Sequence, residues 1–374
     1  MIELLATGLI YHSKKMGRQT PIARHPTLVA GEREMLAIFD LFTEQDPDSY
    51  RTYISRSENQ GESWDDPTPL LPNALIQDPV RPSTHVARPE RMSNGQLVAV
   101  VGRSFRDGDG DEKMVRQHMG RNDMDLHLAV SNDDGRNWKE LRPIVPPLDC
   151  PTWEVAHAPI ELKDGRWLLP LVTWRTLQGE APHGIKAVAF VSTDQGKTWP
   201  SYIDILDDYA NDVIHWEQSV IQLHDEDHRL LAIAWAFNEQ LGKTTSVNYA
   251  VSHDGQTFSH PPRVTGLKAE TSKLLALPDG RAICAYRSID PGGLCASVVH
   301  LQNDQWHHSD PVVLWQGVKI SMMSGDKEAL DELEAIKFGY PNLLLLPNGD
   351  VMVAFWCLED DLFNIRWVRL SITD

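Results

Sequence analysis

Two short stretches decide the fold of this 374-residue chain: Ser131–Trp138 reads SNDDGRNW and Ser192–Trp199 reads STDQGKTW. Both have the form S-x-D-x-G-x-x-W. Ser57–Trp64 (SENQGESW) matches with Asn in place of Asp, and Ser252–Phe258 (SHDGQTF) matches with one residue deleted and Phe in place of Trp. In such a turn the Asp side chain accepts backbone amide hydrogen bonds and Gly takes a positive φ. We therefore expect each box to close a hairpin and to have a structural role.

Short apolar runs beside Asn-Gly, Asp-Gly or Asp-containing turns recur along the chain, a pattern typical of β-hairpins. The turns lie near residues 94, 164, 227, 279 and 348, at intervals of 70, 63, 52 and 69 residues, and a turn near Gly31 precedes them. Six such units, each with roughly four short strands, favour an all-β, six-bladed β-propeller over a sandwich. We expect a single domain over residues 1–374, with the first apolar strand of each unit along the central axis.

Three segments outside the repeat carry further expectations. The two ends of the chain should close the ring, with Glu3–Tyr11 forming a strand beside Asn364–Ile372. Gly325–Lys337 has apolar residues at helical spacing, which predicts a helix between the fifth and sixth units. Arg103–Arg121 is rich in Asp, Gly, Arg and Lys and predicts a long polar insertion, a kind of loop that is often functional.

The composition argues against several classes of protein. With 35 Lys and Arg against 53 Asp and Glu the net charge is −18, so we expect no nucleic-acid partner. No run approaches the roughly 18 apolar residues of a membrane-spanning helix, and the first residues, MIELL, lack the positive start of a signal peptide. We therefore expect a cytoplasmic protein without membrane association. The four cysteines form no CxxC pair, which favours buried free thiols: Cys150, Cys284, Cys295 and Cys357.

Polar side chains stand at or just before the start of each inner strand, where a propeller brings its strands together at one mouth of the channel. Such groups are costly to desolvate unless they pair with one another or meet a ligand. Each could be a ligand-binding residue or a structural partner between blades. The candidates are Arg24, His25, His85, Arg88, Glu90, Glu154, His157, His215, Glu217, Glu270, Lys273, Lys337 and Tyr340.

Together with the boxes and the six units, three segments resemble the bacterial exo-sialidases and the wider sialidase-like superfamily. They are Ala23–Val29 (ARHPTLV), Glu217–Leu223 (EQSVIQL) and Gly339–Gly349 (GYPNLLLLPNG). The resemblance covers nearly the whole chain. It implies a six-bladed propeller with Asp-box hairpins and a glycoside hydrolase that removes a terminal acidic, sialic-acid-like sugar from an oligosaccharide or glycoconjugate without a cofactor.

The same resemblance implies roles for particular residues. Arg24 falls in the segment that is similar to the family's R-I-P motif, whose arginine binds the substrate carboxylate. Tyr340 falls where the family keeps its nucleophilic tyrosine, and Glu217 where it keeps the glutamate that activates that tyrosine. The family's acid/base aspartate lies between the first arginine and the first box, which gives Asp46, with Asp48 as the near alternative.

These residue types suit the chemistry. The anomeric carbon of a sialic acid carries a carboxylate that would repel an anionic Asp or Glu nucleophile, whereas a phenol deprotonated by a nearby Glu attacks without that penalty. An Asp then protonates the leaving oxygen and later activates water. The products would retain the anomeric configuration.

The chain departs from the family in the carboxylate clamp, which two further arginines complete. Leu231–Phe237 (LAIAWAF) contains none, and neither does Ser288–Leu294 (SIDPGGL). Arg287, Lys273 or Arg88 could replace them, although a lysine does not reproduce a planar bidentate guanidinium. We assign substrate binding to Arg24, His25, His85, Arg88, Glu90, His157, His215, Lys273 and Arg287.

Four histidines at comparable positions keep a second function open: His25, His85, His157 and His215. In a propeller polysaccharide lyase, a His or Tyr removes the proton α to a uronate carboxylate while an arginine or a metal offsets the charge. Converging neutral imidazoles would also suit a divalent transition metal ion. A third alternative is a non-catalytic glycan-binding propeller in which tryptophans stack on sugar rings.

Overall fold

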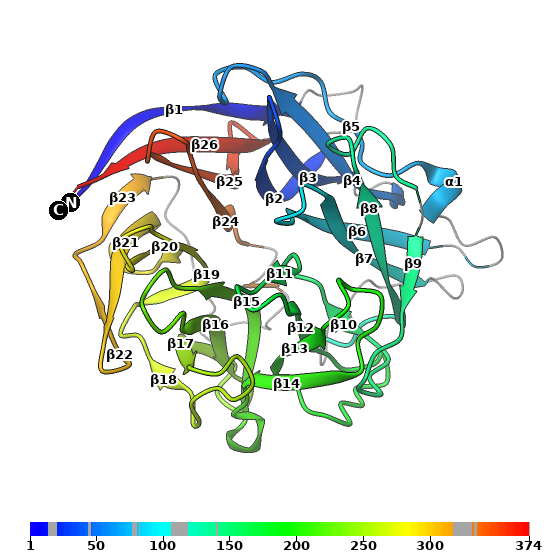
Figure 1. The fold of residues 1–374 in the computed structure, drawn as a ribbon, viewed down its shortest axis with the longest axis vertical. Coiled ribbons are helices and arrows are strands. Elements are labelled where there is room, and N and C mark those ends of the chain that lie inside the picture. The colour runs from blue at the N-terminus through cyan, green and yellow to red at the C-terminus, as the bar shows by residue number, and fades with distance from the viewer. Residues whose placement is uncertain are drawn as a thin grey trace.

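The computed structural model is a ring of six antiparallel β-sheets, the blades, around a central channel (Figure 1). It describes residues 1–13, 21–43, 46–76, 81, 83–105, 119–139, 141–316, 331–332 and 335–373, and gives the backbone alone for residues 46–49 and 74. The predicted all-β class and six-bladed propeller are confirmed.

Blades one to three follow the chain from the innermost strand outward. Blade one consists of β2 (Ile22–Ala30), β3 (Met35–Thr43), β4 (Asp46–Ser57) and β5 (Thr68–Pro69). Blade two consists of β6 (Ser83–Arg91), β7 (Leu97–Phe105), β8 (Met124–Ser131) and β9 (Leu141–Ile144). In blade three the inner strand is split into β10 (Trp153–Glu154) and β11 (Ile160–Glu161), which both pair with β12 (Trp167–Thr173), followed by β13 (Ala187–Ser192) and β14 (Ser201–Leu206).

Blades four to six continue the ring. Blade four consists of β15 (Val213–Gln222), β16 (Leu230–Asn238), β17 (Lys243–Ser252) and β18 (Arg263–Val264). Blade five consists of β19 (Ala269–Ala276), β20 (Ala282–Ser288) and β21 (Gly293–Gln302), and both β22 (Gln305–His308) and β23 (Val312–Trp315) pair with β21. Blade six consists of β24 (Phe338–Leu345), β25 (Val351–Glu359), β26 (Leu362–Ile372) and β1 (Ile2–His12).

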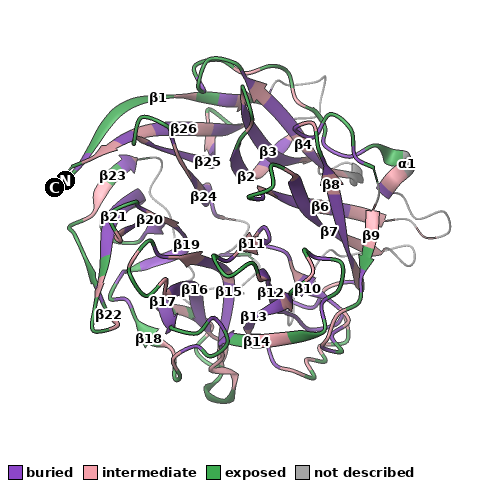
Figure 2. Cartoon of the chain, in the orientation of Figure 1, coloured by how far each residue is buried: buried purple, intermediate pink, exposed green. Residues whose placement is uncertain are grey.

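The second strand of each blade is apolar on both faces because neighbouring blades cover it from both sides (Figure 2). Leu97–Val101 on β7 and Leu230–Ala236 on β16 are 0–1 % exposed along their whole length. Continuous apolar runs, rather than strict alternation, are typical of strands that are buried on both faces. These runs are the ones that follow the predicted turns.

The ends of the chain close the ring as expected. β1 pairs antiparallel with β26, from Ile2 opposite Ile372 to His12 opposite Asn364. The first and last strands therefore share one sheet, and the ring cannot open at blade six without breaking that pairing.

The predicted boxes close the hairpins between the third and fourth strands of blades one to four. In the box of blade three, Ser192 Oγ donates to Asp194 Oδ1 at 2.7 Å, and the amides of Gly196 and Thr198 donate to Ser192 Oγ and Asp194 Oδ1, both at 2.9 Å. The equivalent amide–Ser bonds measure 2.8–3.0 Å in the other three boxes. The geometry confirms the structural role expected of these segments.

Side chains of neighbouring blades accept hydrogen bonds from backbone amides of the inner strands. The amide of Ala87 on β6 donates to Thr52 Oγ1 of blade one at 2.9 Å. The amide of Leu28 on β2 donates to Asn342 Oδ1 of blade six at 2.8 Å. Polar residues beside the channel are therefore part of what holds the blades together.

The remaining elements in the described part of the chain are small. The structure has a short helix α1 (Asn73–Ile76) and a 3₁₀ helix η1 (Tyr209–Asn211). Of the helix predicted at Gly325–Lys337, residues 325–330 and 333–334 lie outside the described residues, as do residues 106–118 of the polar insertion; Asp331 and Glu332 are helical. No helix in the described part of the chain is long and apolar enough to cross a membrane. All four cysteines are free and buried, as predicted.

Asp194→Ala should destabilise the protein by about 1–2 kcal/mol, because its carboxylate accepts bonds from Ser192 and from both the amide and the hydroxyl of Thr198. These bonds lower the pKa of Asp194 to about 2, and the bond from the Thr198 hydroxyl has the largest effect. The stabilisation is therefore complete above the ordinary pKa of 3.8 and is lost as the pH falls through about 2. Urea unfolding at about pH 7 and about pH 3 measures it, with the exposed neighbour Lys197→Ala as control. Equal losses in both variants would contradict the prediction.

Candidate active site

A cavity of about 860 Å³, the front cavity, lies at the end of the channel where the inner strands begin. It gathers residues from β2, β6, β10, β15 and β24: Arg24, His25, His85, Arg88, Glu154, Glu217 and Tyr340. The structure therefore brings the predicted nucleophile, its activating glutamate and the predicted carboxylate-binding arginine to one site.

The backbone is bulged at three of these residues. The pairing register shifts between Arg24 and Thr27, between Trp216 and Ser219, and between Gly339 and Asn342. Within the shifts, His25, Glu217 and Tyr340 have φ values of 54°, 50° and 51°. Left-handed conformations of such residues cost about 1–3 kcal/mol each, and bulges redirect side chains. The backbone of three inner strands is therefore strained where these strands border the front cavity.

Tyr340 stands at the floor of the front cavity. Its side chain is buried, and its hydroxyl donates to the Ala156 carbonyl at 2.6 Å. The ring of His25 meets the tyrosine ring edge-on at a centroid distance of 4.7 Å. Burial, with the charges of Glu217 and Glu154, raises the pKa of Tyr340 above its ordinary value despite the nearby Arg88. The phenol therefore needs a base and a positive charge to ionise.

Glu217 is an acid with an unusual environment. Its amide donates to Glu154 Oε2 at 2.9 Å, and its own Oε2 is buried without a hydrogen-bond partner among the described residues. Burial and the charge of Glu154 raise the pKa of Glu217, and the charges of Arg287 and Lys273 oppose this rise. A carboxylate of raised pKa is a better proton acceptor than an ordinary surface glutamate.

A buried charge network borders the cavity on the side of blades one and two. Asp40 on β3 is fully buried, accepts bonds from Arg88 Nη2 at 2.8 Å and Thr52 Oγ1 at 2.7 Å, and bonds His25 Nδ1 at 3.0 Å. Burial alone would raise the pKa of Asp40, but Arg88 and His25 hold it well below its ordinary value. The Tyr50 hydroxyl also donates to this carboxylate at 3.2 Å.

The network adds residues that sequence reasoning did not find. Asp40 interrupts the apolar run MLAIFDLF of β3, and this interruption was the available signal. Arg121 lines the front cavity with its guanidinium 4.0 Å from the ring centroid of Trp174. No motif marks Arg121, which ends the polar insertion and reaches the cavity through tertiary packing. Arg24 lies similarly against Trp356, at 4.9 Å.

His85 lines the same cavity and is neutral there. Burial first, and then the charge of Arg51, lowers its pKa to about 4. The pKa of His25 is also lowered by burial, in spite of its bond to Asp40. Both imidazoles are therefore uncharged near neutral pH.

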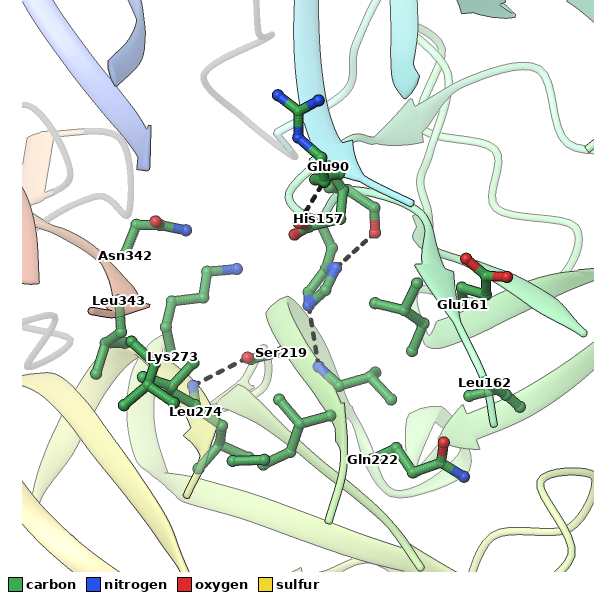
Figure 3. A pocket seen from close by; sticks show the side chains of 18 of the residues that line it. Glu90, His157, Glu161, Leu162, Ser219, Gln222, Lys273, Leu274, Asn342 and Leu343 are labelled. Atoms are coloured by element: carbon green, nitrogen blue, oxygen red, sulfur yellow. Dashed lines mark hydrogen bonds between the residues drawn. The ribbon is translucent and has the colours of Figure 1, made fainter. Parts of the chain in front are cut away.

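Three predicted residues line a different cavity of about 810 Å³, the rear cavity, at the end of the channel away from the starts of the inner strands. They are Glu90, His157 and Lys273, and Arg88, Ala156 and Tyr340 border both cavities. Figure 3 shows the rear cavity from close by. Burial raises the pKa of Glu90 to about 7. These residues therefore lie behind the tyrosine rather than beside Arg24.

His157 is a link between blades. Its Nδ1 bonds the Ala158 carbonyl at 2.7 Å, and its Nε2 accepts the amide of Val220 at 3.3 Å (Figure 3). Burial and the charge of Lys273 lower its pKa to about 4, which is consistent with a neutral ring whose two nitrogens are both occupied.

Two predicted binding residues line neither cavity, which corrects the sequence analysis. His215 is fully buried within blade four and bonds Asn248 Nδ2 at 3.2 Å. Arg287 is buried and donates to Glu270 Oε2 from Nη2 at 2.7 Å and from Nε at 3.0 Å. The four histidines therefore do not converge: His215 precedes the bulge that redirects Glu217, and His157 belongs to the rear cavity. Among the described residues no group of three His, Cys, Asp or Glu could hold a metal ion.

Asp46 and Asp48 have no described side chains. The backbone of Asp46 begins β4 opposite Thr43, the last residue of β3. Their assignment as acid/base therefore stays a prediction.

Comparison with known proteins identifies the family. A family model described as a BNR repeat-like domain matches residues 35–353. The chain belongs to the BNR repeat-like domain family. A search of curated protein sequences gave no match to this BNR repeat-like protein.

Solved structures extend the fold comparison. A protein of unknown function from Dyadobacter fermentans is similar over 100 % of this chain and 99 % of its own, at 18 % identity and a TM-score of 0.74. A Trypanosoma rangeli sialidase in complex with 2,3-difluorosialic acid, a covalent intermediate, is similar over 99 % of this chain but 59 % of its own, at 15 % identity and a TM-score of 0.66. A Penicillium chrysogenum α-L-arabinanase complexed with arabinobiose is similar over 99 % and 98 %, at 13 % identity and a TM-score of 0.61. These likenesses confirm the resemblance to the sialidase-like superfamily at the level of the fold.

Glu217→Gln should raise the melting temperature by about 1–3 °C at about pH 8 and leave it unchanged at about pH 4. The reason is that a raised folded-state pKa makes the ionised carboxylate unfavourable above its ordinary pKa of 4.5, whereas below that value both states are protonated. Thermal melts at the two pH values measure this, with the exposed Glu62→Gln as control. A lower melting temperature at the higher pH would show that ionised Glu217 stabilises the fold.

Arg287→Met should destabilise the protein by about 3–5 kcal/mol, because it leaves the buried Glu270 carboxylate without its guanidinium partner. Adding Glu270→Gln should recover most of the loss. Urea unfolding of both single variants and the double variant tests the pair. A single Arg287 variant of unchanged stability would refute the structural role and restore Arg287 as a candidate binding residue.

Proposed function

We propose that this protein is a retaining glycoside hydrolase that removes a terminal acidic sugar, with Tyr340 as nucleophile and Glu217 as its base. One observation carries the proposal: both residues sit on left-handed bulges of inner strands and line the same cavity as three arginines. Two bulky residues held in strained backbone beside one cavity are typical of a functional site.

The proposed reaction has two steps. Tyr340 passes its proton to Glu217 and its oxygen attacks the anomeric carbon, while the glycosidic C–O bond breaks and the leaving oxygen takes a proton from Asp46. Water then attacks the same carbon, gives its proton to Asp46 and releases the tyrosine, which recovers its proton from Glu217. We assign the acid/base role to Asp46 because its sequence position resembles that of the family's acid/base aspartate, and Asp48 is the alternative.

The arginines support an anionic substrate. Arg24 and Arg121 line the cavity and lie against Trp356 and Trp174, and Arg88 is a cation fixed by Asp40. We propose that Arg24 and Arg121 bind the substrate carboxylate, so that Arg121 takes the place of a clamp arginine that Leu231–Phe237 and Ser288–Leu294 lack. Planar guanidinium groups suit this task because each can donate two parallel bonds to a carboxylate.

The structural neighbours support carbohydrate ligands in general, since one is a sialidase complexed with 2,3-difluorosialic acid and another an arabinanase complexed with arabinobiose. The proposed mechanism uses protein groups only and requires no cofactor. The partner we propose is an oligosaccharide or glycoconjugate, and the cytoplasmic location also stays a prediction.

A specific observation favours one second candidate, a polysaccharide lyase. The bond between His25 Nδ1 and Asp40 orients a neutral imidazole whose ring contacts Tyr340. In this reaction His25 would take the proton α to a uronate carboxylate, the C–O bond at the β carbon would break with its oxygen leaving as an alcohol that takes its proton from the Tyr340 hydroxyl, and an arginine would offset the carboxylate charge. The product would be unsaturated and would contain no added water.

Mass spectrometry of products from sialylated, ulosonic-acid and uronic-acid glycans separates the candidates, with and without a chelator. Fragments that gain water support the hydrolase, an unsaturated fragment supports the lyase, and no cleavage of any glycan favours the non-catalytic binding protein.

Tyr340→Phe should lower kcat for a cleaved glycoside at least about a thousandfold while leaving substrate binding within a few fold, because the hydroxyl acts in the transition state. Incubation with a 2,3-difluorinated acidic sugar should add its glycosyl mass to the peptide that contains Tyr340. Tyr50→Phe, which removes a hydroxyl in the same cavity, is the matched control. Labelling of another peptide, or full activity in Tyr340→Phe, would refute the assignment.

A further inference from the structure

Lys273 lines the rear cavity beside Ala156 and Tyr340, the residues that border both cavities. It belongs to β19 of blade five and is 5 % exposed. Its Nζ donates to the backbone carbonyls of Ala156 at 3.0 Å and Gln218 at 2.7 Å. Among the described residues, no carboxylate forms a hydrogen bond or ion pair with this amine. Burial lowers the pKa of Lys273 to about 8, and the charges of Glu217 and Glu154 oppose this lowering, so that the amine is an ammonium at neutral pH.

Tyr340 shares one of these acceptors. Its hydroxyl donates to the Ala156 carbonyl at 2.6 Å, and Lys273 Nζ lies 4.9 Å from the centroid of its ring. One carbonyl oxygen therefore accepts hydrogen bonds from the proposed nucleophile and from a buried cation. Figure 3 shows Lys273 extending from β19 between His157 and Asn342.

Ionisation of Tyr340 would make the contact between its oxygen and the Ala156 carbonyl oxygen repulsive, whereas this contact is now an attractive hydrogen bond. Once the proton has left, a phenolate oxygen would face the Ala156 carbonyl oxygen with no hydrogen between them. A donor is then needed at this point, and the ammonium of Lys273 is already bonded to the same carbonyl. In a buried site the attraction between ammonium and phenolate is stronger than in water.

The other ionisable groups around this pair include one more positive charge, that of Arg88, which forms a buried ion pair with Asp40. The groups are Arg88 on β6, Glu154 on β10, Glu217 on β15, His25 on β2, and His157 between β10 and β11. Arg88, although paired with Asp40, favours ionisation of the phenol by its charge and a side-chain hydrogen bond, whereas the two carboxylates oppose it. Burial holds the pKa values of both histidines low.

We propose that Lys273 is a positioning residue for Tyr340, whose phenolate it stabilises from behind by charge and by a hydrogen bond. The inference rests on the proposed function for the step in which the phenolate forms. In that step Tyr340 loses its proton to Glu217, while Lys273 keeps all its protons and shifts one hydrogen bond from the Ala156 carbonyl to the phenolate oxygen. Because Lys273 lines the rear cavity, it would act on the nucleophile and not on the substrate.

The test is the ionisation of residue 340 itself. Replacing Tyr340 by tetrafluorotyrosine lowers the intrinsic pKa of the phenol toward the pH range in which Lys273, whose pKa burial lowers to about 8, still carries its charge. The fluorinated ring gives a fluorine NMR signal that reports the charge of the phenol. Lys273→Gln removes the positive charge and keeps an N–H donor. In this variant we expect the phenol pKa to rise by about one to two units. Lys163→Gln, at an exposed lysine of the same rear cavity, should leave it unchanged.

An unchanged phenol pKa in the Lys273→Gln protein would overturn the inference, even if the wild type hydrolyses glycans. A rise supports it even if no glycan is cleaved, so the two proposals fail separately. Lys273→Arg, which keeps the charge, should keep the parent pKa within about half a unit. This variant is the second test if Lys273→Gln does not fold by circular dichroism, and a rise of one unit or more in it would overturn the inference.

Activity gives a further readout if a substrate is found. With an aryl glycoside whose leaving group needs no protonation, Lys273→Gln should lower kcat about ten- to a hundredfold with KM nearly unchanged. An equal loss in Lys163→Gln would count against a specific effect on Tyr340.

Discussion

Six sheets that meet around an axis present their inner edges to a narrow channel, where backbone amides and carbonyls have few partners within their own sheet. Side chains of neighbouring blades provide these partners. Thr52 accepts the amide of Ala87, Asn342 accepts the amide of Leu28, and Lys273 donates to the carbonyl of Ala156. The requirement to satisfy the inner edges therefore places polar residues at the one point where all six blades approach each other.

The same constraint prepares a site for chemistry. Where an inner strand bulges, its regular pairing is interrupted, and one side chain turns from the space between blades toward the front cavity. His25, Glu217 and Tyr340 occupy such positions on three different blades. The cost of about 1–3 kcal/mol for each left-handed residue is tolerable because the surrounding sheets are buried and rigid.

The buried charged side chains, like the inner-edge backbone groups, also need partners. Asp40 with Arg88, and Glu270 with Arg287, are nearly inaccessible to water, so each charge depends on its partner. Removing one member of such a pair costs more than the pair contributes. The two pairs differ in what they serve. Arg88 brings a fixed positive charge to the front cavity, whereas Arg287 lies beneath Gly339 and supports the strand that carries Tyr340.

The sequence by itself determined the fold class, the number of blades, the boxes and the closure of the ring, because these depend on local turn chemistry and on apolar runs that repeat along the chain. It also indicated Arg24, Glu217 and Tyr340, whose positions at the starts of inner strands follow from the same repeat. Only the tertiary structure decided which side chains meet. A bulge reverses the alternation of a strand, so His215 is buried while Glu217, two residues later, faces the cavity. Arg121, Asp40 and the contact between Lys273 and Tyr340 join distant segments, and no local pattern determines such distances.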